Sequence, residues 1–277
     1  MINNYSINRE DIENRLSGAF IAVGSAKALR YGGKKVINST LMGIDTKMEP
    51  NPEDTKLLHQ KTEEAIKLSG MDKYGVNIQY LKEPPVRKPF SQCKLNEETI
   101  INGYNCSYLP HKYKNFPKET ILMPEKRRAL SGLHELGHAI VDHSKGGKLL
   151  SVIDRPARRN HNKFLKWMTL WGAFSEKCEK KDNKELSVLE KANNLVRDNA
   201  GVLVAGMMAP VITSEFLASF QAQKLANKLF DKKMAGRILK SNGVGLASYV
   251  LHTLLIGAVA TCAVKAKDKY MEHCANR

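Results

Sequence analysis

Residues 129–144 read Ala-Leu-Ser-Gly-Leu-His-Glu-Leu-Gly-His-Ala-Ile-Val-Asp-His-Ser, and this stretch decides how the rest of the chain is interpreted. It contains the pattern H-E-x-x-H. Four residues along an α-helix are slightly more than one turn, so the imidazoles of His134 and His138 project from one face and can bind a single metal ion. Glu135 follows the first histidine and can take a proton from a water molecule bound to that metal.

The residues around this pattern favour a helix that packs against a core. Pro124 precedes the stretch, and Leu133, Leu136 and Ile140 form one apolar face. Zinc suits such a site, because it lowers the pKa of its bound water toward neutrality and a carboxylate is then a sufficient base. The alternative interpretation is a structural pair of helix histidines without a metal.

At this point the chain resembles the zincin metallopeptidases, specifically the gluzincins, whose third ligand is a glutamate on a later helix. Residues 214–219 read Ser-Glu-Phe-Leu-Ala-Ser. They are similar to the E-x-x-A-[DS] element of the heat-shock membrane metalloproteases and the related bacterial neutral zinc metallopeptidases. The resemblance implies that His134, His138 and Glu215 bind Zn²⁺ and that Glu135 is the base in the hydrolysis of a protein or peptide substrate.

The resemblance covers about residues 120–230 and has two departures. Ser219 stands where the membrane proteases carry Asp, and the stretch 145–199 matches neither group. The related metzincin pattern is excluded by counting, since it needs Gly three residues and His six residues after the second ligand, where this chain has Val141 and Ser144.

Position along the predicted helices also favours Glu215 over His143 as the third ligand. Glu215 shares a stripe with small and apolar residues, and a carboxylate on such a face is costly to bury unless a positive charge meets it. The stripe continues through Ala218, Ala222, Leu225 and Leu229. His143 lies five residues after His138, which turns it about 140° away around the helix. We therefore expect His143 to lie outside the metal site.

The remaining patterns predict an α+β protein, with a small, mostly antiparallel sheet followed by a mainly helical zincin-like domain. Helices are expected over residues 8–30 and from Pro52 to Leu68. Strands are expected over 76–80, on both sides of Asn102-Gly103 (98–101 and 104–109) and over 119–123. A substrate strand is expected to pair with an edge at 119–123. The predicted regions are 1–75, a catalytic domain 76–230 with a basic insert 145–199, and an extension 231–277.

Two uncharged stretches bear on the membrane. Residues 200–214 are too short to span a bilayer and are expected to form a core helix. Residues 243–264 are long enough, so this segment is either a membrane helix or a buried helix. Tyr249 and His252 lie in or beside it and could stabilise an oxyanion, although such residues more often only fill a helix face. A mean hydropathy of −0.38 excludes a polytopic membrane protein.

Charge leaves two competing functions open. The formal net charge is +16, and residues 101–277 hold 29 basic against 15 acidic side chains. An excess of this size favours an anionic partner. One alternative is a basic nucleic-acid-binding protein with a structural histidine pair, and the other is an inactive membrane-associated scaffold that binds metal. The five widely spaced cysteines, without a C-x-x-C pair, and the lack of a recognisable secretory signal favour an intracellular location.

Overall fold

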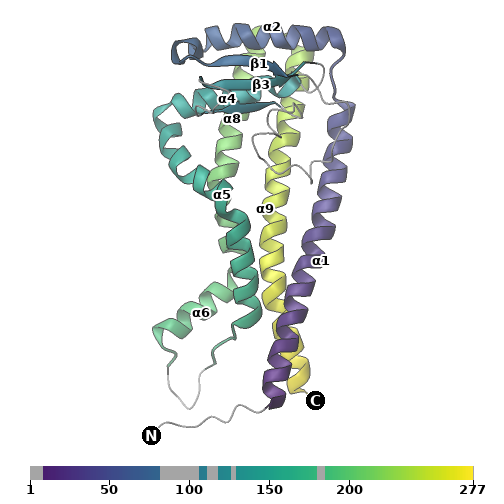
Figure 1. Cartoon of the computed structure of the whole chain (residues 1–277), viewed down its shortest axis with the longest axis vertical. Helices are drawn as coiled ribbons and strands as arrows, with labels where there is room; N and C mark the ends of the chain where they lie inside the picture. Colours follow the sequence, from purple (N-terminus) through teal and green to yellow (C-terminus); the bar gives the residue numbers. More distant parts are fainter. Residues whose placement is uncertain (1–8, 82–105, 111–117, 126–128, 180–184, 277) are drawn as a thin grey trace. The chain divides into compact units, whose positions relative to one another are not determined.

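The computed structural model describes residues 9–81, 106–110, 118–125, 129–179 and 185–276 (Figure 1). Most of these residues are helical, and three short strands form one small sheet, so the coarse α+β prediction is confirmed. The helices are α1 (Arg9–Lys47), α2 (Pro52–Leu68), α4 (Gly132–His143), α5 (Lys145–Phe174), α6 (Val188–Asp198), α7 (Ala200–Gly206), α8 (Ala209–Leu229) and α9 (Lys232–Ala275). The strands are β1 (Asn77–Leu81), β2 (Ser107–Leu109) and β3 (Thr120–Pro124). Short 3-10 turns, Met71–Tyr74 and Ala129–Ser131, precede β1 and α4.

The chain divides into two compact units, each assembled from separate stretches. The sheet unit comprises Asn38–Arg155 and Pro210–Tyr249. The bundle unit comprises Met1–Ile37, Pro156–Ala209 and Val250–Arg277. The helix that carries the H-E-x-x-H pattern and the segment around Glu215 both belong to the sheet unit.

The sheet is mixed, so the prediction of a mostly antiparallel sheet is corrected. Its order is β1-β3-β2, with β3 parallel to β1 and antiparallel to β2. β2 pairs with the edge of β3 that faces away from β1, so β1 and β3 are parallel neighbours although β2 lies between them in the sequence. The predicted strand 98–101 and the turn at Asn102-Gly103 lie outside the described residues, and the predicted strand 104–109 is described only from residue 106, with β2 at Ser107–Leu109.

β3 is the central strand, which overturns the expectation that residues 119–123 form an edge. All five of its residues are buried, as is typical of a strand with a neighbour on each side. The strand edge beside α4 is instead β2, which contacts that helix. Any pairing of a substrate strand within the described sheet would therefore involve β2 or β1.

One face of the sheet joins the core of the sheet unit. Ile121 and Met123 of β3 pack with Leu58 of α2 and with Leu133 and Leu136 of α4. The predicted helix Pro52–Leu68 is confirmed with the same bounds. Its start is fixed locally, because the side chain of Asn51 accepts a hydrogen bond from the amide of Asp54 and Pro52 suits the first helical position.

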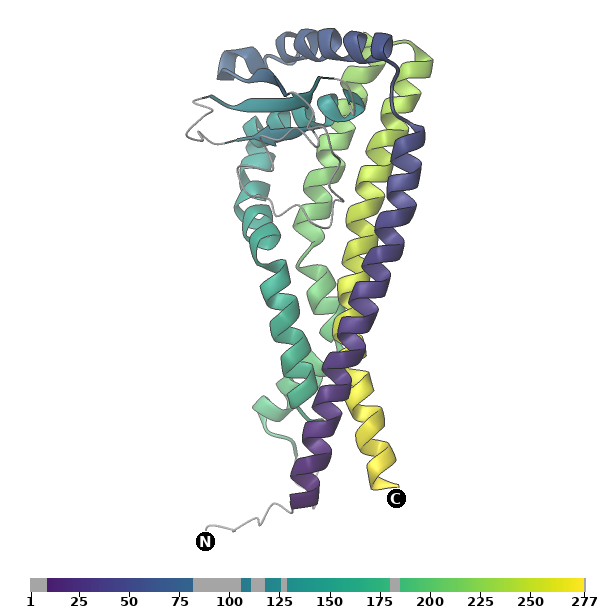
Figure 2. The same cartoon turned by 45° about the vertical axis from the view of Figure 1, so that its right-hand side comes forward.

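The first helix is longer than the predicted 8–30 and continues through Gly32 and Gly33 to Lys47. Two glycines cost helix stability, about 1 kcal/mol each relative to alanine. Packing accounts for one of them, since a β-carbon added at Gly33 would lie 2.4 Å from the Cδ1 of Leu255. Figures 1 and 2 both show α1 running alongside α9. Tertiary packing therefore outweighs the local helix-breaking signal.

Two helical stretches are long and apolar enough to cross a membrane by length and composition, Ala200–Leu229 and Lys232–Ala275. The first contains the predicted core segment 200–214, in which Ala200, Val204 and Val211 are buried. The second contains the uncharged segment 243–264, in which Val259, Ala260 and Ala263 are among the buried residues.

Candidate metal centre

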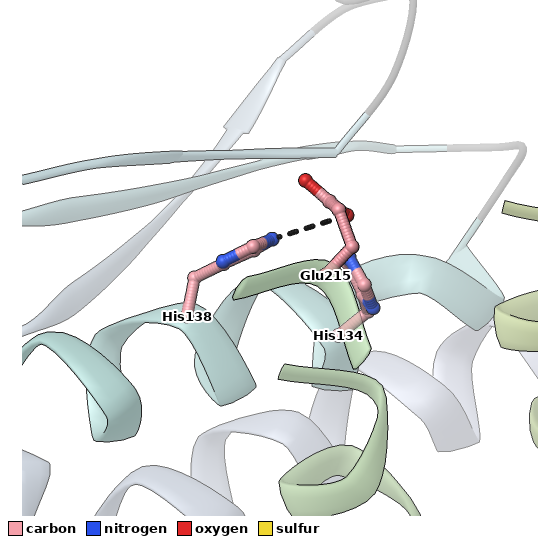
Figure 3. A group of neighbouring side chains, drawn as sticks. All are labelled: His134, His138 and Glu215. Carbon is pink, nitrogen blue, oxygen red and sulfur yellow. Dashed lines mark hydrogen bonds and ion pairs between the residues drawn. The ribbon is translucent and has the colours of Figure 1, made fainter. Parts of the chain in front are cut away.

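Three side chains of the sheet unit converge on one point: His134 and His138 of α4 and Glu215 of α8 (Figure 3). A carboxylate oxygen of Glu215 lies 3.1 Å from Nε2 of His134 and 3.5 Å from Nε2 of His138. The candidate ligand atoms all lie within 4.8 Å of one another. These three residues, called the ligand trio below, could hold a metal ion.

The trio forms because α4 and α8 approach each other closely. A β-carbon added at Gly137 would lie 2.1 Å from the backbone oxygen of Ala218, so no larger residue fits there without movement of a helix. Ala218 itself is completely buried. This contact places Glu215, nearly one turn before Ala218, across from both histidines. Gly137 therefore supplies the space that the metal-ligand pattern needs.

Ser219 lies on the far side of the His134 ring from Glu215. Its Oγ is 3.2 Å from Nδ1 of His134, while Nε2 of the same ring faces Glu215. When Nδ1 is protonated and donates a hydrogen bond to Ser219, Nε2 keeps its lone pair for a metal. The residue that departs from the resemblance therefore still orients the first histidine.

Glu135 stands next to the trio without belonging to it. The backbone amide of Tyr108 on β2 donates a hydrogen bond of 2.8 Å to its carboxylate. Burial raises the pKa of Glu135, and the neighbouring Glu215 adds to this increase, while His134, His138 and the Tyr108 amide oppose it. A carboxylate in this environment therefore holds a proton more readily than an exposed one.

His143 lies apart from the trio, as its position along the helix predicts. Its Nε2 is 2.8 Å from a carboxylate oxygen of Glu119, and its ring stacks on Tyr74 with a centroid distance of 4.0 Å. The hydroxyl of Tyr108 donates to the same oxygen of Glu119 over 2.7 Å. Tyr108, Glu119 and His143 thus form a hydrogen-bonded network, called the Tyr108 network below.

The Tyr108 network was not predicted from the sequence. Burial of the ring and the hydrogen bond that its hydroxyl donates to Glu119 raise the pKa of the Tyr108 phenol, so the hydroxyl remains a donor. Through Glu119 the network links Tyr108 on β2 to His143 at the end of α4, while the Tyr108 amide contacts Glu135 nearer the start of the same helix. The contact to Glu135 uses the backbone amide of Tyr108, which no side-chain motif marks.

The other predicted site candidates lie elsewhere in the sequence and the fold. Tyr249 and His252 are on α9, whereas the ligand trio comes from α4 and α8. His252 belongs to the bundle unit and Tyr249 to the sheet unit.

No protein-family model, curated protein or solved structure matches this chain. The functional argument is therefore built on the residues of the site.

Proposed function

We propose that the chain is a zinc-dependent endopeptidase of the gluzincin type. The observation that carries the proposal is the convergence of the H-E-x-x-H histidines with a buried glutamate 81 positions after the first of them. Two histidines on a helix have several structural uses. Two histidines and a glutamate are one of the ligand sets found in catalytic zinc sites with three protein ligands.

The two distances from Glu215 to the imidazoles are compatible with zinc. With zinc–ligand bonds of about 2.0–2.1 Å in a tetrahedral arrangement, ligand atoms lie about 3.3–3.4 Å apart. The glutamate oxygen lies 3.1 and 3.5 Å from the two imidazole nitrogens. A carboxylate and two imidazoles are also donors that zinc accepts. The nearly complete burial of the Glu215 side chain would then be balanced by a divalent cation.

Glu135 would serve as the general base. When bound, zinc supplies a polarised substrate carbonyl and a water of lowered pKa. Glu135 would take a proton from the attacking water as the water oxygen bonds to the carbonyl carbon, and it would give that proton to the amine as the peptide C–N bond breaks. The amide of Tyr108 holds the carboxylate in place for both transfers.

An extended peptide is the substrate that the surroundings favour. β2 lies at the edge of the described sheet and carries the residue that contacts Glu135. Pairing of backbone groups with a strand edge tolerates varied side chains, which suits a protease acting on unfolded segments.

The test is hydrolysis of a denatured, fluorescently labelled protein by the purified full chain. We expect cleavage that a chelator stops and zinc restores, and no cleavage by the Glu135→Gln variant. Stoichiometric zinc without turnover on any denatured protein would instead favour the inactive scaffold. Salt-dependent binding of nucleic acid by a chain that contains no zinc would favour the nucleic-acid-binding alternative.

A further inference from the structure

Two helices of the bundle unit, α1 and α5, lie side by side and run in opposite directions. Arg30 of α1 donates a hydrogen bond of 2.8 Å to the Asn162 side chain of α5. Further along the same pair, Ala19 and Ala22 share an apolar cluster with Ala173. The residue number thus rises along one helix as it falls along the other, which defines an antiparallel pair.

Both helices also pack against α9, and these contacts fix which way each helix faces. An added β-carbon at Gly18 would lie 3.1 Å from Tyr270, and one at Gly172 would lie 2.8 Å from Val264. At 100° per residue, Leu16, Phe20, Lys27 and Lys34 of α1 fall within about 40° of one direction. Arg159, Lys163, Lys166, Leu170 and Phe174 of α5 fall within about 80°. On each helix, the direction of the stripe is separated from the direction of α9 by the side that contacts the other helix. The two stripes therefore lie next to each other on the side of the pair that faces away from α9, and they form one surface, called the α1–α5 surface below.

One part of the α1–α5 surface is strongly cationic. It contains six basic side chains, of which five are exposed and Arg30 is half-buried: Lys27, Arg30, Lys34, Arg159, Lys163 and Lys166. The sequence has no Asp or Glu over residues 14–44 or 155–175, so neither helix supplies a neutralising charge along these stretches. The cations therefore add to one another and attract anions.

The neighbouring part of the same surface is apolar and exposed. Phe20 is 77% exposed and Phe174 is 62% exposed, with Leu170 at 51% and Leu16 at 47%. The antiparallel pairing brings residues 16–20 of α1 close to residues 170–174 of α5. Large apolar side chains gathered beside a cationic cluster are the two elements of a surface that binds the lipid–water interface.

We propose that the α1–α5 surface docks the protein onto an anionic lipid bilayer, with Phe20, Phe174 and the two leucines entering the interface and the six cations meeting lipid phosphates. The hydrocarbon of a bilayer takes up all four apolar side chains, whereas a nucleic acid base can stack on the two phenylalanine rings but not on Leu16 or Leu170. A membrane surface therefore fits the composition better than nucleic acid does. This docking is independent of the metal site.

The same geometry favours binding at the surface over crossing the membrane. The uncharged part of α9 packs beside a basic part of α1, because Leu255 of α9 contacts α1 at Gly33, which is next to Lys34. If α9 spanned a bilayer within this bundle, these cations would enter hydrocarbon at a cost of about 2.5–3.5 kcal/mol each on insertion scales.

The experiment is flotation of the purified full chain with vesicles of phosphatidylcholine, alone or with about 30% phosphatidylserine. We expect binding to the anionic vesicles only, reduced at least tenfold when salt is raised from about 0.1 to 0.5 M. The variant with Lys27, Lys34, Lys163 and Lys166 changed to Gln should bind at least thirtyfold more weakly. The matched variant with Lys177, Lys240, Lys265 and Lys269 changed to Gln has the same net charge and should bind like the wild type.

A second pair of variants tests the apolar part. Phe20→Ser with Phe174→Ser should reduce binding at least tenfold, and Val250→Ser with Leu254→Ser on α9 should leave it within twofold. The proposal is overturned if binding ignores lipid charge and resists alkaline carbonate, which would indicate a spanning α9. It is equally overturned if the α9 variant alone loses binding, if both lysine variants weaken binding alike, or if the chain binds nucleic acid and no vesicle.

Discussion

Both units of the chain bury charged side chains, but they surround them with different partners. In the bundle unit, Arg197 and Lys267 are almost completely buried, and both donate hydrogen bonds to the backbone oxygen of Ser175, with a distance of 2.9 Å from Lys267. Arg197 also pairs with Asp268. These cations satisfy a carbonyl beyond the end of α5, where helix carbonyls lack partners and positive charge is favourable.

In the sheet unit one buried charge is the carboxylate of Glu215, and it faces two imidazoles in a group that could hold a metal ion. Burial of charge alone therefore does not distinguish a functional site from a structural one. The groups around the charge differ: in the bundle unit the backbone oxygen of Ser175 and the carboxylate of Asp268 accept hydrogen bonds from the buried cations, whereas in the sheet unit two imidazoles face the buried carboxylate.

The largest expected effect is on catalysis in the sheet unit. Glu135→Gln should lower the rate of peptide hydrolysis at least about a thousandfold, because the amide cannot accept the proton from water, while zinc content stays at the wild-type level. The control is Glu176→Gln, which removes a carboxylate that pairs with Arg15 in the bundle unit. Activity of Glu135→Gln within threefold of the wild type would reject the assigned role.

The next largest effect is on metal binding. Glu215→Ala should weaken zinc binding at least about a hundredfold, because two protein ligands remain where a catalytic site uses three. Without metal, the same variant should be no less stable than the wild type, since it removes a buried carboxylate. Zinc titration and chemical denaturation measure the two quantities.

His143→Ala is the matched control for Glu215→Ala, since it removes a histidine of the same helix that lies outside the trio. It should keep its zinc. If zinc is lost from His143→Ala and retained by Glu215→Ala, the gluzincin assignment fails while a metal site at His134 and His138 still stands.

In the bundle unit the expected effect is on stability alone. Arg197→Ala removes hydrogen bonds to Ser175 and Asp268 and should lower the free energy of unfolding by about 2 kcal/mol. Its zinc affinity should equal that of the wild type. If Arg197→Ala loses zinc as well as stability, the buried cations of the bundle unit are not purely structural, and the contrast between the two units fails.

The smallest expected effect concerns the Tyr108 network. Glu119→Ala removes the acceptor shared by the Tyr108 hydroxyl and His143, so the amide that holds Glu135 should be placed less well. We expect kcat to fall about tenfold with KM within twofold and zinc content unchanged. Glu119→Gln keeps an acceptor oxygen and should restore kcat to within threefold. Equal losses in both variants would contradict a positioning role.

Features set by neighbouring residues were predictable from the sequence. The helix Pro52–Leu68 carries its own start signal in Asn51 and Pro52, and the H-E-x-x-H helix has a marked apolar face. The mixed sheet was not predictable in the same way. Pairing of β1 with β3 depends on where the chain between them runs, and strand propensity contains no information on that route.

Within the site, the side chains were accessible to sequence reasoning and the backbone contacts were not. His134, His138 and Glu215 follow from ligand chemistry and from the stripe through Ala218. The amide of Tyr108 has no residue signature, because any residue except proline supplies the same donor. Gly137 was visible in the motif, yet its function in admitting α8 depends on a helix far away in the sequence.

The most direct test of the central claim is the metal content of the purified full chain, measured by mass spectrometry after removal of loosely bound ions. The ligand trio predicts one zinc per chain, retained through dialysis and removed by a strong chelator. A chain that contains no stoichiometric metal after purification and after incubation with zinc would contradict the claim.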